Sequence, residues 1–142
     1  STKDVQMKLK IFVIDDEESI RDTFRWHLED LGHEVLTFAE PVDCDVQKFC
    51  ECQKTSPCCD ALLIDYHMPG MNGLDFVEIL LKGGCQGNAG NVLLMSGDTT
   101  KIDMKKVAEI GCQVEQKPLS LETLEKWVDG VALRRESDGC GD

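Results

Sequence analysis

The sequence predicts an α/β fold, a three-layer sandwich in which helices cover both faces of a parallel sheet. Apolar runs of strand length alternate along the chain with longer segments of helical period, which is the pattern of successive β–α units. Three of the runs are almost entirely apolar, as strands buried on both faces are: residues 9–14, in which Lys10 is the one polar residue, 61–64 and 92–95.

Two further strands are less apolar. Residues 34–38 form a shorter run, and in residues 112–116 Cys112 and Val114 alternate with polar side chains. Such patterns are typical of strands at the edges of a sheet. With strands one, three and four at the centre, the chain fits the flavodoxin-like (βα)5 fold with strand order 2-1-3-4-5.

Helical periodicity fills the gaps between these strands. Apolar residues recur at spacings of three and four in residues 20–31, 42–49, 74–81 and 121–131. The periodicity is weakest in residues 101–110. We expect residues 8–134 to form one domain, with an N-terminal extension of residues 1–7 and a C-terminal tail of residues 135–142.

Length and charge narrow the class of protein. The 142 residues suit a single domain, and 42% hydrophobic with 30% charged residues is an ordinary globular composition. The net charge of -12 argues against nucleic acid or an anionic membrane as a direct partner, because both attract basic surfaces. We find neither a membrane-spanning run nor an apolar signal segment, and therefore expect a cytoplasmic protein.

Three aspartates follow central strands of the predicted sheet. Asp15 and Asp16 come directly after strand one, and Asp65 comes after strand three. Ligands of open parallel sheets bind at the carboxyl ends of the strands, so these carboxylates should share one crevice. Their mutual repulsion requires a cation, and oxygen ligands with room for water suit Mg²⁺.

A hydroxyl and an ammonium group are expected at the same edge. Ser96 closes the apolar run of strand four, and Lys117 closes strand five. Phosphoryl transfer needs a metal ion, a hydroxyl donor and a lysine, because negative charge spreads over three oxygens in its transition state. A carboxylate can be the nucleophile, which yields an aspartyl phosphate.

These residues lie in short motifs that resemble the response regulator receiver domain (CheY-like) over about residues 8–133. Asp15 and Asp16 follow VID, Asp65 lies in LLIDYHMPGMNGLDF, Ser96 lies in VLLMSGD, and Lys117 precedes Pro118. The resemblance implies a two-component signalling protein that accepts a phosphoryl group from a sensor histidine kinase or phosphotransfer protein. It also implies that phosphorylation switches the binding of a downstream protein, whose identity the sequence does not give. Self-catalysed phosphoryl transfer and autodephosphorylation would be the only chemistry of the chain. A homodimer is compatible with the resemblance.

The resemblance also implies a role for each site residue. Asp65 would be the phosphoacceptor and a metal ligand, and Asp16 would bind Mg²⁺ directly. Asp15 would act through water, and the backbone carbonyl of His67 would complete the protein ligands. Ser96 would form a hydrogen bond with an oxygen of the phosphoryl group. Lys117 would form an ion pair with the phosphoryl group or with the Asp65 carboxylate, and a cis peptide bond to Pro118 would direct it into the site.

Alternatives remain for several of these residues. Asp15 and Asp16 could cap and stabilise a helix N-terminus. His67 and Asp98 would flank the path of the attacking water, although Asp98 could instead cap the fourth helix. We assign His33 to a turn. An aspartate-based phosphatase is the rival enzyme class, but it requires Asp-x-Asp, whereas here the two aspartates are adjacent.

Two features depart from the family pattern. Val114 occupies a position that is usually aromatic, so movement of the Ser96 loop would have to carry the signal. Five cysteines, Cys44, Cys50, Cys52, Cys58 and Cys59, gather before strand three. They could be core residues or ligands of zinc or an iron–sulfur cluster, which would make the chain a cysteine-ligated metal or redox sensor on a receiver-like fold.

Overall fold

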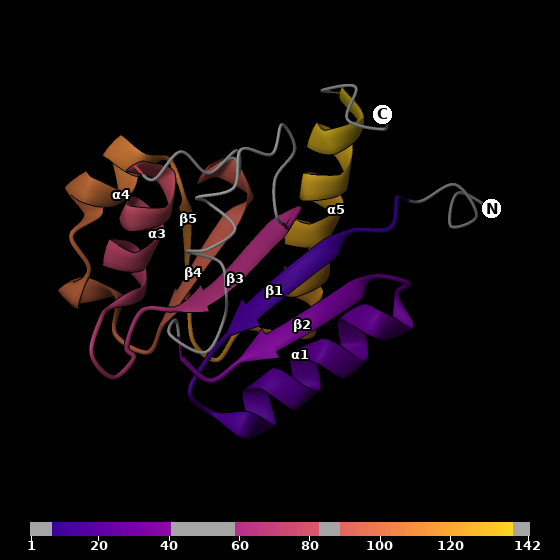
Figure 1. The fold of residues 1–142 in the computed structure, drawn as a ribbon, viewed down its shortest axis with the longest axis horizontal. Helices are drawn as coiled ribbons and strands as arrows, with labels where there is room; N and C mark the ends of the chain where they lie inside the picture. Colours follow the sequence, from indigo (N-terminus) through magenta and orange to yellow (C-terminus); the bar gives the residue numbers. More distant parts are fainter. Residues whose placement is uncertain (1–6, 41–58, 83–88, 138–142) are drawn as a thin grey trace.

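The computed structural model describes residues 7–40, 59–82 and 89–137, and its centre is one parallel sheet in the order β2-β1-β3-β4-β5 (Figure 1). The predicted strand order is confirmed, with the two less apolar strands at the edges. β3 and β4 continue past their apolar runs to include Asp65 and Ser96. The strands are β1 (Lys10–Ile14), β2 (Glu34–Phe38), β3 (Ala61–Asp65), β4 (Val92–Ser96) and β5 (Gln113–Gln116).

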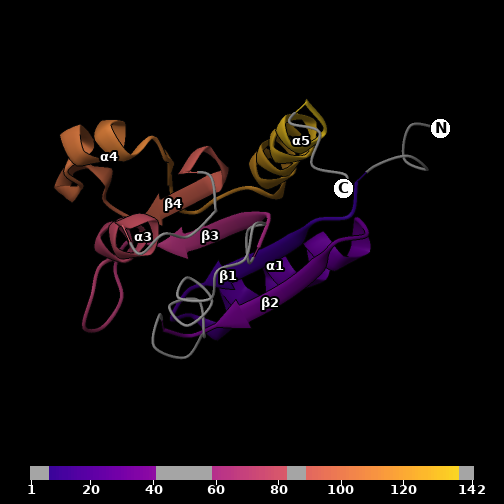
Figure 2. The same cartoon turned by 45° about the horizontal axis from the view of Figure 1, so that its top comes forward.

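Helices pack on both faces of the sheet and give the predicted three layers (Figures 1 and 2). α1 (Glu18–Asp30) and α5 (Leu121–Ser137) cover one face, and α3 (Gly73–Lys82) and α4 (Met104–Ile110) cover the other. Alternate strand residues enter the two cores, as the pleat requires: Val13 packs with Phe24 and Val128, whereas Ile14 packs with Phe76 and Val107.

The weakly periodic region contains two short helices. A 3₁₀ helix, η4 (Thr99–Lys101), precedes α4, and this interruption explains why no single helical period runs through residues 101–110. The helix predicted over residues 42–49 lies outside the described residues. Within the described ranges, no helix is both long enough and apolar enough to cross a membrane.

α5 continues to Ser137, past residue 134 where we ended the domain. Two arginines explain its extra length. Arg134 donates hydrogen bonds to Asn91 Oδ1 and to the Gly90 carbonyl, both at 3.0 Å. Arg135 lies 2.8 Å from Asp60 Oδ1. The helix therefore extends three residues beyond residue 134, and the side chain of Arg135 packs against Asp60.

His33 lies at the end of the turn that follows α1, where the sequence predicted it, and its ring is buried. Its side chain is 4% exposed, and Nδ1 accepts a hydrogen bond of 3.1 Å from the Leu9 N–H. Burial lowers the pKa of His33, because the charged imidazolium loses its hydration. The neutral ring thus ties the start of β2 to the residue before β1.

Candidate functional site

The predicted site residues meet at one edge of the sheet. Asp15 follows β1, Asp65 and Ser96 are the last residues of β3 and β4, and Lys117 follows β5. Because all strands are parallel, these four positions share the carboxyl edge. The Lys117 N–H also donates a 2.8 Å hydrogen bond to the Ser96 carbonyl, which extends the sheet pairing to the lysine itself.

The Lys117 ammonium is shared by three carboxylates. Its Nζ lies 2.9 Å from Asp15 Oδ2, 3.4 Å from Asp65 Oδ2 and 3.8 Å from Glu17 Oε1. Asp15 and Asp65 are almost completely buried, at 0% and 3% exposed. One positive charge thus faces two buried carboxylates and a third that is exposed, so the negative charge of this group is only partly compensated by Lys117.

Burial dominates the ionisation of the two buried aspartates. Desolvation, followed by the charge of Asp15, raises the pKa of Asp65 to about 6. Desolvation also raises the pKa of Asp15, although the Glu17 N–H and Lys117 oppose it. Burial disfavours the charge on Lys117, but the combined attraction of Asp15 and Asp65 outweighs it, so its pKa is raised. At neutral pH, therefore, Asp65 is mainly ionised and Lys117 is charged.

Three acidic side chains form a group that could hold a divalent cation. Oxygens of Asp15, Asp16 and Glu17 all lie within 4.8 Å of one another, with Asp15 buried and the other two exposed. Hard carboxylate ligands with an open, hydrated side match the preferences of Mg²⁺. Asp65 is connected to this group through their common neighbour, Lys117.

Glu17 was not among the predicted ligands. It is the residue before α1, and its side chain makes no capping hydrogen bond. The sequence signal was the uninterrupted acidic run after β1. His67 donates its N–H to Asp65 Oδ1 at 3.3 Å, while the role predicted for its carbonyl stays a prediction.

Asp15 combines the two roles that the sequence left open. Its Oδ1 accepts the Glu17 N–H at 2.9 Å, which supports the start of α1, and its Oδ2 faces Lys117. Its backbone carbonyl accepts a hydrogen bond of 2.7 Å from Arg21 of α1. These contacts hold the residue in one orientation at the bottom of the crevice.

Ser96 is fully buried, and its hydroxyl points into its own loop. Ser96 Oγ accepts the Asp98 N–H at 3.0 Å. Asp98 in turn accepts hydrogen bonds from Thr100, which lower its pKa, with a smaller effect from nearby His67. Asp98 caps η4, whereas Asp103 caps α4 by accepting the Lys106 N–H at 3.1 Å. The suggestion that Asp98 caps the fourth helix was therefore wrong.

Gly73 allows the start of α3 to lie directly against Asp65. A Cβ atom at this position would come within 2.4 Å of the Asp65 carbonyl oxygen and 2.9 Å of Leu94 Cδ1. The Gly73 N–H donates to the Tyr66 carbonyl at 2.9 Å. Any larger residue would have to displace the segment that carries Asp65.

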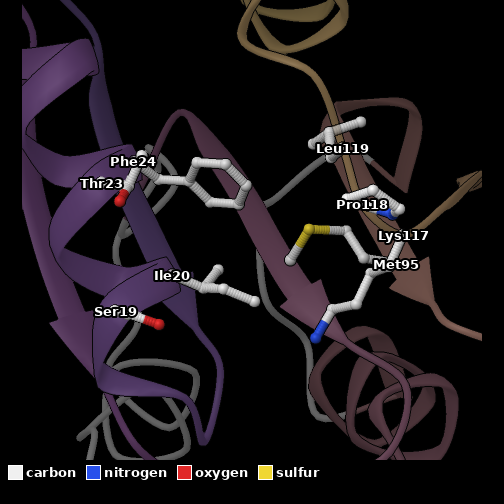
Figure 3. A pocket seen from close by; sticks show the side chains of 8 residues that line it. All are labelled: Ser19, Ile20, Thr23, Phe24, Met95, Lys117, Pro118 and Leu119. Carbon is white, nitrogen blue, oxygen red and sulfur yellow. The ribbon is translucent and has the colours of Figure 1, made fainter.

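An apolar hollow of about 210 Å³ lies beside the site, between α1 and the segment that leads into α5 (Figure 3). In Figure 3, Ile20 and Phe24 project from α1 toward Met95, with Lys117 and Leu119 on the far side. The remaining lining residues are Ser19, Thr23 and Pro118. The Lys117–Pro118 peptide bond at its rim is cis, as the resemblance implied.

Most of the cysteines for which we considered a metal or redox role lie outside the described part of the chain. Of the five clustered cysteines, the structure describes Cys59, which is half-buried against the core beneath α3 and α4. Cys112 is buried in that core, and burial raises the pKa of its thiol, so it behaves as a small apolar residue. Cys44, Cys50, Cys52 and Cys58 lie outside the described residues, and their metal or redox role stays a prediction.

The chain is similar to known proteins in sequence and in fold. A family model described as "Response regulator receiver domain" matches residues 11–129. A probable transcriptional regulatory protein from Picosynechococcus sp. is 30% identical over 124 residues, which cover 85% of this chain and 48% of that protein. The cyclic di-GMP phosphodiesterase response regulator RpfG of Xanthomonas campestris is 38% identical over 76 residues, which cover 52% of this chain and 18% of RpfG.

Among solved structures, a response regulator receiver domain protein from Clostridium thermocellum superposes with a TM-score of 0.71 at 24% identity. The match covers 89% of this chain and 96% of that one, and it shows a common fold. The curated relatives are longer: this chain spans less than half the length of each.

Proposed function

The chain belongs to the response regulator receiver domain family, and on this premise we propose that Asp65 is its phosphoacceptor. The observation that carries the proposal is the pair of contacts from Lys117, which link the Asp65 carboxylate to the buried Asp15. A buried, charged cluster at the carboxyl edge of a parallel sheet is where a binding or catalytic site is expected, which supports the proposal.

In the proposed reaction, a carboxylate oxygen of Asp65 attacks the phosphorus of a phosphohistidine on a partner protein. A P–O bond forms, the P–N bond breaks, and the electron pair returns to the imidazole of the partner, which takes up a proton. The product is an acyl phosphate on Asp65. Because the pKa of Asp65 is raised only to about 6, most of the carboxylate is ionised and nucleophilic at neutral pH.

The proposed metal ligands are Asp16 directly, Asp15 through water, Asp65 and the His67 carbonyl, and the cluster gives reason to add Glu17. When bound, Mg²⁺ would neutralise the charge that develops on the phosphoryl oxygens. Lys117 supplies the second positive charge. As it already lies between Asp15 and Asp65, a short movement would transfer it to the phosphoryl group. Ser96 would donate its hydroxyl proton to another phosphoryl oxygen.

The physiological donor in this proposal is a sensor histidine kinase or a phosphotransfer protein. The output is a changed protein surface that a downstream protein recognises, and hydrolysis of the acyl phosphate resets the chain. In this proposal His67 and Asp98, whose side chains are close enough for His67 to affect the pKa of Asp98, flank the path of the attacking water. The chain would thus act as a switch and not as an enzyme with multiple turnovers on an external substrate.

The test is phosphorylation by a small phosphodonor, such as acetyl phosphate, with Mg²⁺. Intact-mass spectrometry should show one added phosphoryl group in the wild-type protein and in Asp22→Asn, an aspartate on α1 outside the site. Asp65→Asn should show none. A phosphoryl group that persists in Asp65→Asn would contradict the proposal, and sustained hydrolysis of added phosphoesters would favour the phosphatase alternative.

A further inference from the structure

The side chain of Gln116 spans from β5 to the loop that follows β4. Its Nε2 donates a hydrogen bond of 2.7 Å to the Gly97 carbonyl, and its Oε1 accepts the Thr99 hydroxyl at 3.3 Å. Gln116 is also the β5 residue paired with Ser96 in the sheet register. One amide group therefore holds two residues of the segment 96–99, which begins with the site hydroxyl.

These hydrogen bonds hold the segment in the position where Ser96 faces its own loop. Ser96 Oγ accepts the Asp98 N–H at 3.0 Å, and this residue lies between the two that Gln116 contacts. The accepted N–H leaves the hydroxyl proton of Ser96 free to donate, but it holds Oγ toward the loop, so a shift of this hydroxyl toward a phosphoryl group on Asp65 would stretch the contact. The peptide units of Gly97 and Asp98 must then adjust their positions as well.

No side chain packs against Gly97 on the side where a Cβ atom would project. A Cβ atom added to Gly97 would meet nothing within 4 Å, so there is open space around the residue that Gln116 holds. Gly97 is exposed, in contrast to fully buried Ser96. With space on one side and hydrogen bonds on the other, the polar contacts determine where the segment rests.

We propose that Gln116 is a positioning residue that restrains the segment 96–99 and so opposes engagement of Ser96 with the phosphoryl group on Asp65. This inference rests on the proposed phosphoacceptor function. Loss of the Gln116 contacts should release the segment and strengthen binding of phosphoryl analogues. Since a net intramolecular hydrogen bond changes an equilibrium by a few-fold, we expect a gain of about three- to tenfold.

The experiment measures the affinity of the purified chain for beryllofluoride in saturating Mg²⁺ by isothermal titration calorimetry. Gln116→Met removes both polar contacts at similar volume, and Thr99→Val removes one of them. Both variants should bind beryllofluoride more tightly than the wild-type protein. Thr99→Ser, which keeps the hydroxyl, should behave as wild type, and so should Gln113→Met, an exposed glutamine at the other end of β5.

Two readouts separate positioning from a general structural effect. The affinity for Mg²⁺ alone should be the same in Gln116→Met and in the wild-type protein, because Ser96 is not among the acidic ligands. In a Ser96→Ala background, Gln116→Met should no longer change the affinity for beryllofluoride. This non-additivity is what coupling through Ser96 requires.

Each outcome has a defined meaning. Unchanged or weaker beryllofluoride binding by Gln116→Met, or an equal gain in the Ser96→Ala background, overturns the inference and leaves the phosphoacceptor function intact. If the wild-type protein forms no adduct, or Asp65→Asn forms one as readily, the proposed function itself fails, and the inference fails with it.

Discussion

Lys117 lies nearer to Asp15 than to the proposed acceptor, with its ammonium 2.9 Å from the buried Asp15 carboxylate. In this position the ammonium group of Lys117 partly neutralises the Asp15 and Asp65 carboxylates, which a bound divalent cation would also neutralise. The side chain of Lys117 is 16% exposed, so the pair is shielded from water, and its removal would leave unpaired charges in the crevice.

Lys117→Met should therefore destabilise the protein in the presence of a chelator. Breaking a fully buried ion pair costs roughly 3–5 kcal/mol, and we expect a loss of about 2 kcal/mol or more here. Urea unfolding measures the difference. Mg²⁺ should recover part of the loss, since it neutralises the same carboxylates. Lys126→Met, at an exposed ion pair on α5, is the control, and equal stability of the two variants would contradict the prediction.

Asp65→Asn should stabilise the protein in the absence of a divalent cation. The pKa of Asp65 is raised from 3.8 to about 6 in the folded state, so between these values the folded state binds more protons than the unfolded state. The stability therefore falls as the pH rises through this window, and the loss is complete above it. As one pKa unit corresponds to about 1.4 kcal/mol, the gain at pH 8 is on the order of 2–3 kcal/mol. Thermal unfolding should show a higher melting temperature for Asp65→Asn than for the wild-type protein at pH 8, and nearly equal melting temperatures near pH 4.

His33 should make stability fall in mild acid. Its pKa is lowered in the fold, so below the ordinary value of about 6.5 the unfolded chain binds a proton that the folded chain excludes. His33→Asn keeps an acceptor for the Leu9 N–H without titrating in this range. We compare the two proteins in an Asp65→Asn background by urea unfolding from pH 7.5 to 5.5. The free energy of unfolding should fall more steeply with decreasing pH when His33 is present than in His33→Asn. Equal dependence on pH in the two proteins would refute this role.

Gly73→Ala should disturb both the fold and the phosphoacceptor. The added methyl group would lie 2.4 Å from the Asp65 carbonyl oxygen, an overlap that backbone movement must relieve. We expect a loss of about 1–3 kcal/mol, as for other overpacked sites, together with slower phosphorylation. Gly130→Ala in α5, whose closest contact would be an ordinary van der Waals contact with Arg134 at 3.4 Å, should be neutral or stabilising.

Sequence reasoning predicted the features that depend on local pattern. Continuous apolar runs located β1, β3 and β4 because strands covered on both faces contain few polar residues. The same runs located Asp15, Asp65 and Ser96, since each follows or ends a strand at the carboxyl edge. The parallel topology then brought these residues together without any further information from the sequence.

Contacts between distant residues were not predictable in the same way. His33 follows a glycine and has the polarity of a turn residue, but its ring is buried by accepting a hydrogen bond from Leu9. The end of α5 depends on Arg135 meeting Asp60, a residue more than half the chain away. The contacts of Gln116 likewise arise from strand pairing, and no local motif marks them.

The anchored end of α5 has a mechanical consequence. Arg134 and Arg135 attach it to the segments that enter β4 and β3, at the edge of the sheet opposite Lys117. The other end, at Leu121, follows directly on the Lys117–Pro118 segment. A displacement of α5 that originates at Lys117 must therefore be a tilt about a fixed pivot, largest at Leu121 and smallest at Arg135.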